Sequence, residues 1–295
     1  VLVVLVRVER GVEERNGIAL LPSSFIRTPQ VLAGLVANAL MFFFMGAQSI
    51  LMAPYLQLVA GWSPVEVGVI SIVTGVPTFA LALGIPKLLP HASPRHVIQV
   101  GYVAMAAALG VMMFSVTTDG ASAPGVYLGA FLAGVGAGTV SSHASNVVAL
   151  ALPERDASQS GGIQSTMRNV GQAFGVALLG AVLLFGITNT VRSGAESDML
   201  VSRQVSDRVS EMSVNLGSNH EFEEQISDIP MTDSERSELV KIDARARAES
   251  TRVAYAVGGA IVLLGLLTTP AIKTSGKRED SVVPSPAGAT PSARR

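Results

Sequence analysis

Two long apolar segments, separated by only four polar residues, constrain this chain more than any other feature. The segments span residues 124–152 and 157–191, and the hinge between them is Pro153-Glu154-Arg155-Asp156. Each segment exceeds the roughly 20 apolar residues that cross a bilayer as a helix. Only 15% of the chain is charged, whereas soluble domains carry about 25% charged residues. The chain is therefore predicted to be an all-α membrane protein.

Small residues recur on both segments at the spacing of one helix face. They are Ala130, Gly134, Gly138 and Ser142 on the first segment, and Gly171 and Gly175 on the second. Small residues let membrane helices approach each other closely. Both helices are therefore predicted to pack tightly against neighbours.

Polar residues form a stripe on each of the same two segments. The stripes are Thr139, Ser142, His143 and Asn146 on the first, and Gln164, Arg168 and Gln172 on the second. The i, i+3, i+4 spacing places each set on one helix face. A polar side chain at membrane depth faces a partner helix or a water-filled cavity, because contact with lipid is costly. The stripes therefore predict an internal path.

Four more apolar segments, at about 31–54, 64–86, 96–116 and 252–272, raise the predicted number of complete spans to six. Residues 1–6, VLVVLV, are too short to span and are interpreted as the end of a truncated transmembrane helix. The alternative is a different start codon followed by a short hydrophobic tip.

Basic residues predict the orientation of these spans. Residues 7–30, the loop near 87–95, the hinge and the tail 273–295 together hold 12 Lys and Arg, and the short segments 55–63 and 117–123 hold none. Positive residues in short loops mark the cytoplasmic side. Residues 7–30 are therefore predicted to be a cytoplasmic linker, and residues 273–295, rich in Ser, Pro and Ala, a disordered cytoplasmic tail.

Residues 192–251 are predicted to be an extracytoplasmic helical loop between the fifth and sixth spans. An amphipathic stripe runs along it through Val201, Val205, Val209, Met212 and Leu216. Thr232 and Glu235 fit a capping box, so a helix starting near Asp233 could continue into the sixth span. A solvated charged helix is favoured here over any binding role.

The six spans differ in polarity. The first carries Asn38, Met41, Met45, Gln48 and Met52 on one face, and the second carries Ser71, Thr74 and a kinking Pro77. The third and sixth have few polar side chains. The first, second, fourth and fifth spans are therefore predicted to border a cavity, with the third and sixth facing lipid or supporting the others.

Several functional classes find no support in the residues. The chain has no cysteine and four histidines, and no cluster has metal-ligand spacing. Its net charge of −1 gives no indication of nucleic-acid binding. His143 lies beside Ser141, Ser142 and Ser145, but no carboxylate at membrane depth could orient it as in a triad. We expect no enzymatic activity, no metal and no cofactor.

Local strings resemble one transporter family. Residues 55–64, YLQLVAGWSP, resemble the YLQ-x-x-x-G-[YW]-SP motif after helix seven in the fourteen-helix drug–proton antiporter branch of the major facilitator superfamily. Residues 157–177 resemble that branch's ASG…R-x-x-G-x-A-x-G-x-A segment, and residues 20–27, LLPSSFIR, its LLPL-x-LFR lead-in. The resemblance covers about residues 15–272. It implies the six-helix C-terminal half of such a transporter, in a plasma or inner membrane, partnered by a missing N-terminal half.

The resemblance also concerns the loop after the second span. The family has a G-x-L-A-D-R-x-G-R-R-like gating loop there. This chain keeps basic residues, with Lys87 and Arg95 as gating candidates, but has Pro90 where the acid would stand. The charge lock of the family is therefore not expected in its usual form.

The favoured function is proton-coupled efflux of small lipophilic or cationic compounds by alternating access, driven by the proton gradient. The alternatives are a non-transporting membrane remnant or partner subunit of the same fold, and an uptake transporter. The expected partners are the lipid bilayer, the missing half and a small-molecule substrate, and no nucleic acid. The candidate cavity residues are Asn38, Met41, Met45, Gln48, His143, Asn146 and Gln172.

Two candidates leave alternatives open. His143 has an ordinary pKa near neutrality, and it either serves function or is a hydrogen-bonded packing residue. Arg168, with Gln164, is a gating or structural candidate. It either braces the inner end of the fifth helix by snorkelling toward the cytoplasmic surface, near Glu154 and Asp156, or meets an acid in the missing half.

Overall fold

The computed structural model describes residues 28–118, 120–152, 160–198, 200–211, 219–227 and 229–272. Six helical segments in these ranges are long and apolar enough to cross a membrane, which confirms the predicted all-α, multi-pass fold. Their helices are α3 (Pro29–Pro54), α4 (Pro64–Leu88), α5 (Pro94–Ser115), α6 (Ala123–Leu150), α8 (Ser160–Ser197) and α11 (Asp233–Leu264), the last continued by the 3-10 helix η2 (Gly265–Ala271). Residues 1–6, residues 7–27, the hinge and the tail lie outside the described residues, so the expectations for these segments stay predictions.

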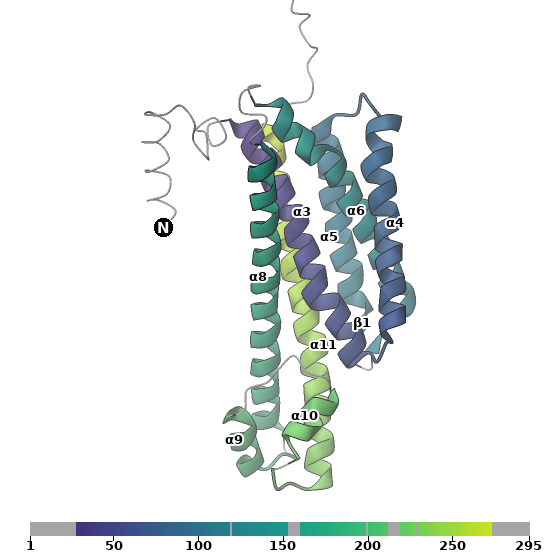
Figure 1. The fold of residues 1–295 in the computed structure, drawn as a ribbon. Coiled ribbons are helices and arrows are strands. Elements are labelled where there is room, and N and C mark those ends of the chain that lie inside the picture. Colours follow the sequence, from purple (N-terminus) through teal and green to yellow (C-terminus); the bar gives the residue numbers. More distant parts are fainter. Residues whose placement is uncertain are drawn as a thin grey trace, which may run out of the picture.

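The six helices lie side by side, and two of them are much longer than the others (Figure 1). Helix α8 has 38 residues and helix α11 has 32. Helix α11 begins at Asp233, where Thr232 and Glu235 form the expected capping box. Both helices project beyond the bundle at the end where the α3–α4 connection and the α5–α6 connection lie.

The α3–α4 connection follows the string at residues 55–64. Helix α3 passes into a π-helix, η1 (Tyr55–Val59), and Gly61 then has a φ of +70°, which favours glycine. Ser63 caps α4 in a capping box with Glu66, and Pro64 occupies the first turn, where its missing N–H is tolerated. These signals stop one helix and start the next within ten residues.

Tyr55 and Arg252 tie this end of the bundle together. The α5–α6 connection is a small hairpin of β1 (Val116–Thr117) and β2 (Gly120–Ala121). The Tyr55 hydroxyl lies 2.6 Å from the Thr117 carbonyl oxygen and 3.0 Å from that of Gly120. Arg252 of α11 donates two hydrogen bonds, of 3.0 and 2.6 Å, to the Val116 carbonyl. Helices α3, α5, α6 and α11 are thereby linked through one hairpin.

Glycines set the closest helix contacts, as their spacing predicts. A Cβ at Gly171 or Gly175 of α8 would clash with the backbone carbonyl of Ala39 or Phe43 of α3. A Cβ at Gly138 of α6 would lie 2.6 Å from the Thr78 carbonyl oxygen of α4. Helix α8 therefore packs against α3, and α6 packs against α4, with backbones in direct contact.

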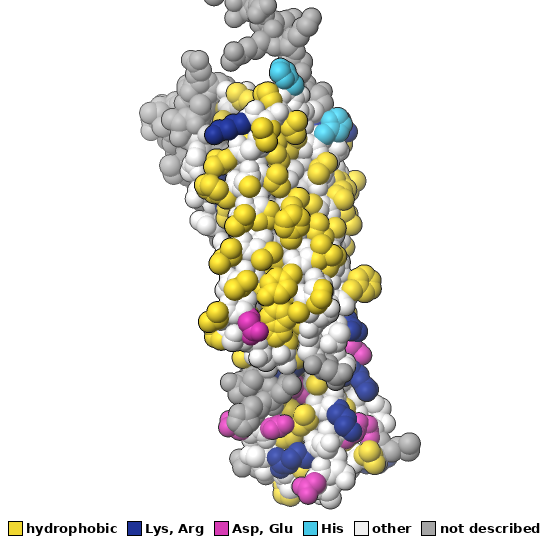
Figure 2. Space-filling view, turned by 90° about the vertical axis from the view of Figure 1, so that its right-hand side faces the viewer, with side chains coloured by type: hydrophobic (Ala, Val, Ile, Leu, Met, Phe, Trp, Pro, Cys, Tyr) yellow, Lys and Arg dark blue, Asp and Glu magenta, His cyan; other side chains and the backbone are white. Residues whose placement is uncertain are grey.

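Apolar side chains cover most of the visible surface of the bundle, and charged side chains gather at the end with the projecting helices (Figure 2). Helix α4 exposes a row of large apolar residues on its outer face. They are Val65, Val69, Ile72, Val76, Phe79 and Leu83. An apolar band of this kind, above a charged end, is the surface of a membrane-spanning bundle.

The projecting ends of α8 and α11, with α9 (Arg203–Glu211) and α10 (Asn219–Gln225), form a unit that we call the helical cap. The described part of the predicted amphipathic stripe is buried in this unit and not exposed along one side of a solvated helix, while Met212 and Leu216 lie outside the described residues. The buried set includes Val201, Val205, Val209, Phe222, Ile226, Leu239 and Ile242. The two long helices supply the apolar partners for the short amphipathic ones.

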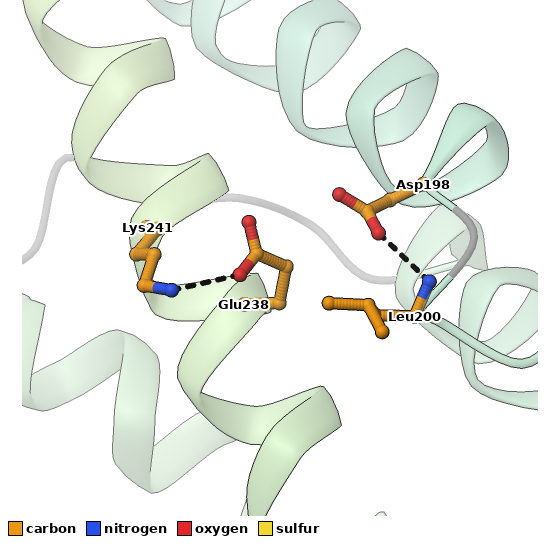
Figure 3. A network of polar contacts seen from close by, with 4 residues as sticks. All are labelled: Asp198, Leu200, Glu238 and Lys241. Carbon is orange, nitrogen blue, oxygen red and sulfur yellow. Dashed lines mark hydrogen bonds and ion pairs between the residues drawn. The ribbon is translucent and has the colours of Figure 1, made fainter.

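Polar contacts occur both at the surface of the cap and in its interior. Figure 3 shows Lys241 paired with Glu238 at 2.9 Å, and the Leu200 backbone N–H donating to Asp198 at 2.8 Å. Deeper inside, Arg247 pairs with Asp243 at 2.7 Å, with both side chains almost fully buried. Burial raises the pKa of the Asp243 carboxyl, and the bonded Arg247 opposes that rise.

Candidate functional site

A cavity of about 560 Å³ lies between helices α3, α4 and α6. We call it the α3–α4–α6 cavity. Its lining residues are Phe44, Met45, Gln48 and Met52 of α3, Ser71, Thr74, Gly75, Thr78, Phe79 and Ala82 of α4, and Ala137 and Ser141 of α6. These side chains are neutral, and they combine aromatic and thioether groups with hydroxyls and one amide. Cavities of this size and composition suit small organic molecules.

The wall of the cavity is positioned by the glycine contacts between α4 and α6. Gly134 and Gly138 bring α6 against the backbone of Thr74 and Thr78. The Thr78 hydroxyl also lies 3.1 Å from the Gly134 carbonyl oxygen, so its single hydrogen is shared between this carbonyl across the contact and the Thr74 carbonyl on α4. These contacts with α6 fix the position of Thr74 and Thr78, although most of the α4 surface is exposed.

Two of the predicted cavity residues, Met45 and Gln48, line this cavity. The other five predicted residues, Asn38, Met41, His143, Asn146 and Gln172, are not among the described lining residues. Asn38 and Met41 are buried in the helix packing, whereas Asn146 and Gln172 are exposed. Their contact with substrate stays a prediction.

Helix α8, the fifth span, contributes no described residue to the α3–α4–α6 cavity, although a place on a cavity was expected for it. Gly171 and Gly175 hold it against α3 instead. Helices α5 and α11 contribute no described residue to this lining either. Gln99 of α5 donates a 2.8 Å hydrogen bond to Thr269 in η2, joining these two helices.

Arg168 lies at a junction of three helices. Its Nε donates to Asn38 Oδ1 of α3 at 3.3 Å, and its Nη2 donates to Ser145 Oγ of α6 at 2.9 Å. The guanidinium also lies 5.6 Å from the ring centroid of Phe42. Asn38 in turn donates to Gln164 Oε1 at 3.4 Å. Arg168 and Gln164 therefore act together as a polar clamp between α8 and its neighbours.

The clamp bears on the two hypotheses for Arg168. Its hydrogen-bond partners Asn38 and Ser145 are neutral groups on α3 and α6, and they solvate the cation in place of water. Glu154 and Asp156, the expected acidic neighbours, lie outside the described residues. A bracing role at this end of α8 fits these contacts, and an additional acidic partner in another part of the protein stays a hypothesis.

His143 forms a local pair with the preceding residue. The Ser142 hydroxyl donates to the Thr139 carbonyl at 2.6 Å, and the same oxygen lies 2.8 Å from His143 Nδ1. A hydroxyl has one hydrogen, so with that hydrogen on the Thr139 carbonyl the imidazole supplies the hydrogen of the second bond. This arrangement predicts that neutral His143 carries its proton on Nδ1.

The two basic gating candidates lie at the opposite end of the bundle from the cap. Lys87 is exposed in the last turn of α4, and Arg95 is partly buried in the first turn of α5. The Arg95 Nε is enclosed and has no hydrogen-bond partner among the described residues. The gating role of both residues stays a prediction.

Sequence reasoning did not select Phe44, Thr78, Phe79 or Ser141, which line the cavity. Thr78 could have been found, because it lies four residues after Thr74 on a helix already assigned to a path, whereas Ser141, two residues after Thr139, lies off the predicted stripe. The aromatic residues carry no such signal. In the described part of the chain, no group of three or more His, Cys, Asp and Glu is placed to hold a metal ion.

Comparisons with known proteins agree with this architecture. The model of the family described as Major Facilitator Superfamily matches residues 1–176. A curated protein of Streptomyces coelicolor, named "Probable actinorhodin transporter", is 24% identical over 200 residues, which is 67% of this chain and 34% of that protein. This chain thus spans about a third of the length of that relative.

Proposed function

Because this chain belongs to the Major Facilitator Superfamily, we propose that it forms the substrate-binding part of a membrane exporter for small lipophilic compounds. The observation that carries the proposal is the α3–α4–α6 cavity, with its soft apolar walls and its scattered hydroxyl and amide groups. Methionine side chains such as Met45 and Met52 repack easily around ligands of different shape. A cavity of this kind suits transport of varied organic molecules without chemical change.

The name of the relative, a probable transporter, supports transport as the activity. Within the superfamily, the strings at residues 55–64 and 157–177 favour the fourteen-helix drug–proton antiporter branch. Proton-driven efflux by alternating access across a plasma or inner membrane is therefore our proposal for the mechanism. The energy source is the proton gradient, and we propose no cofactor.

A second helical half is part of this proposal. Helix α4 contributes one wall of the cavity, and very little of its apolar span is buried within the described residues. The chain also corresponds to only 34% of the relative's length. We propose that a further set of spans packs near α4 and closes the cavity from the other side.

The test is transport by the polypeptide encoded by the complete reading frame that contains this chain. Everted membrane vesicles with an imposed pH gradient should accumulate a lipophilic fluorescent dye, and collapsing the gradient with a protonophore should abolish the accumulation. Gln48→Ala should reduce accumulation several-fold, whereas Gln57→Ala, at an exposed site on η1, should not.

Other outcomes separate the alternative functions. Movement of dye in the reverse direction would indicate an uptake transporter. No gradient-dependent movement of any tested dye, with correctly inserted protein, would favour a non-transporting membrane protein and contradict the proposal.

A further inference from the structure

The hydroxyl groups on the α4 wall of the cavity are all engaged as donors. Ser71, Thr74 and Thr78 each donate to the carbonyl four residues earlier on α4, at 3.3, 3.1 and 2.8 Å. A hydroxyl has one hydrogen and two lone pairs. With the hydrogen held by the helix backbone, each of these groups offers a lone pair to a ligand and no hydrogen.

Gln48 adds an acceptor from the α3 wall. Its side chain lines the cavity and is only 9% exposed. The Oε1 atom is enclosed and has no hydrogen-bond partner among the described residues. Buried amide oxygens in folded proteins are normally paired, so a rotation that turns the Gln48 amide toward the cavity would let this oxygen pair with a donor on a bound molecule.

Apart from the Ser141 hydroxyl on α6, the remaining wall is apolar and without charge. Phe44, Met45, Met52 and Phe79 line the cavity together with small residues, and no Asp, Glu, Lys, Arg or His is among the described lining. A carboxylate or phosphate group would find neither a cation nor a row of donors here. An apolar ring with a hydrogen-bond donor at one edge would match both kinds of surface.

We propose that the α3–α4–α6 cavity selects apolar, ring-containing molecules that donate hydrogen bonds, such as phenols and aromatic amines. Gln48 is the specificity-determining acceptor, and Thr74 and Thr78 assist it. This inference rests on the proposed function, because it assumes that the cavity is the ligand site. It adds that donor groups on the ligand, rather than size or lipophilicity alone, set the affinity.

The experiment compares 1-naphthol with 1-methoxynaphthalene, which differ by replacement of the donor hydrogen with a methyl group. Equilibrium dialysis measures binding of each to the full chain in nanodiscs, after subtraction of partitioning into empty nanodiscs. We expect 1-naphthol to bind about 10-fold more tightly than its methyl ether, as one additional hydrogen bond allows. Gln48→Met, which removes the acceptor at similar volume, should bring this ratio close to one.

Controls keep the result specific. Gln57→Met makes the same exchange at an exposed position on η1 and should leave the ratio at the wild-type value. Thr74→Val keeps the side-chain shape while removing a hydrogen-bond acceptor, and it should also lower the ratio. This second variant keeps the inference testable if Gln48→Met folds poorly. Circular dichroism checks the helix content of each variant.

Two failures are distinguishable. Equal binding of both probes to the wild type, or a ratio that neither Gln48→Met nor Thr74→Val changes, would overturn the donor preference while the cavity remains a ligand site. Binding of neither probe above empty nanodiscs would overturn both this inference and the proposed ligand site.

Discussion

At the scale of single residues, Arg168 shows how a charged side chain is tolerated among apolar helices. The guanidinium uses separate nitrogens for Asn38 on α3 and Ser145 on α6. A lysine has one ammonium group on a flexible stem and cannot reproduce this planar fork. Sequence alone predicts that Arg168 needs partners, but the partners depend on how three helices align, and no local pattern encodes that alignment.

Arg168→Lys should therefore destabilise the bundle although the charge is retained. We expect a loss of about 1–3 kcal/mol in the free energy of unfolding, since hydrogen bonds to charged groups contribute on this scale. Titration of the purified chain with SDS, followed by circular dichroism, measures the change. Arg192→Lys, at an exposed position on the same helix, is the matched control and should be neutral. Equal stability of the two variants would contradict the clamp.

The tautomer of His143 is a second prediction at this scale. The bond from Ser142 to the Thr139 carbonyl leaves the imidazole as donor to Ser142 Oγ. Nitrogen-15 spectra of histidine-labelled protein should show a neutral imidazole protonated on Nδ1, and this signal should disappear in His143→Asn. Ser142→Ala removes the acceptor and should shift the population toward the Nε2–H form. An Nε2–H form in the wild type would show that the Ser142 hydroxyl donates to the ring.

At the scale of helices, the small-residue contacts make a matched pair of substitutions available. A Cβ at Gly175 of α8 would meet the Phe43 carbonyl of α3, whereas a Cβ at Gly110 of α5 meets nothing within 4 Å. Gly175→Ala should lower the unfolding free energy by about 1–3 kcal/mol, as overpacking does, while Gly110→Ala should be neutral or slightly stabilising. SDS titration of both variants is the measurement, and a neutral Gly175→Ala would contradict tight α3–α8 packing.

The helical cap gives a prediction about pH. Glu235 accepts hydrogen bonds from the backbone N–H groups of Ser202 and Thr232 and from the Thr232 hydroxyl. The side-chain hydrogen bond from Ser202, together with these bonds, lowers the pKa of the Glu235 carboxyl from 4.5 to about 2. Because the folded pKa is depressed, the stabilisation is fully present above pH 4.5 and is lost as the pH falls toward 2.

Pepsin cleavage of the cap tests this dependence. Glu235→Gln should be cleaved faster than the wild type at pH 4.5, and the two rates should converge as the pH approaches 2. Glu238→Gln breaks only the surface pair with Lys241, and such pairs contribute little, so it should follow the wild type. A constant ratio between Glu235→Gln and wild type across this range would contradict the assignment.

Helices and their contacts differ in how far the sequence predicts them. The spans follow from apolar length, and the start of α11 follows from the Thr232–Glu235 capping box, because both signals are local. The packing inside the cap was not predicted, since an amphipathic stripe such as Val201, Val205 and Val209 does not identify its partner. The packing of α8 against α3 does not follow from the sequence for the same reason: Gln172 and Gly171 are neighbours, and only the packing decides which face meets α3.

At the scale of the whole molecule, the structure groups the connections at two ends. The α3–α4 connection, the β1–β2 hairpin and the helical cap share one end. The α4–α5 connection lies at the other end, close to Lys87 and Arg95. Among the described connections, the one near Lys87 and Arg95 is thus separated from the short connections without basic residues, and its assignment to the cytoplasmic side stays a prediction.

The orientation itself is testable, because the chain contains no cysteine and any introduced thiol is unique. Thr118 in the β1–β2 turn and His91 in the α4–α5 connection are both exposed. In intact cells, a membrane-impermeant maleimide should label Thr118→Cys and not His91→Cys, and permeabilisation should make both reactive. Labelling of His91→Cys alone in intact cells would invert the orientation. Helix α5 is the one helix between the two positions, so they lie on opposite sides of the membrane if α5 crosses it. Labelling of both from one side would therefore contradict the grouping of the connections.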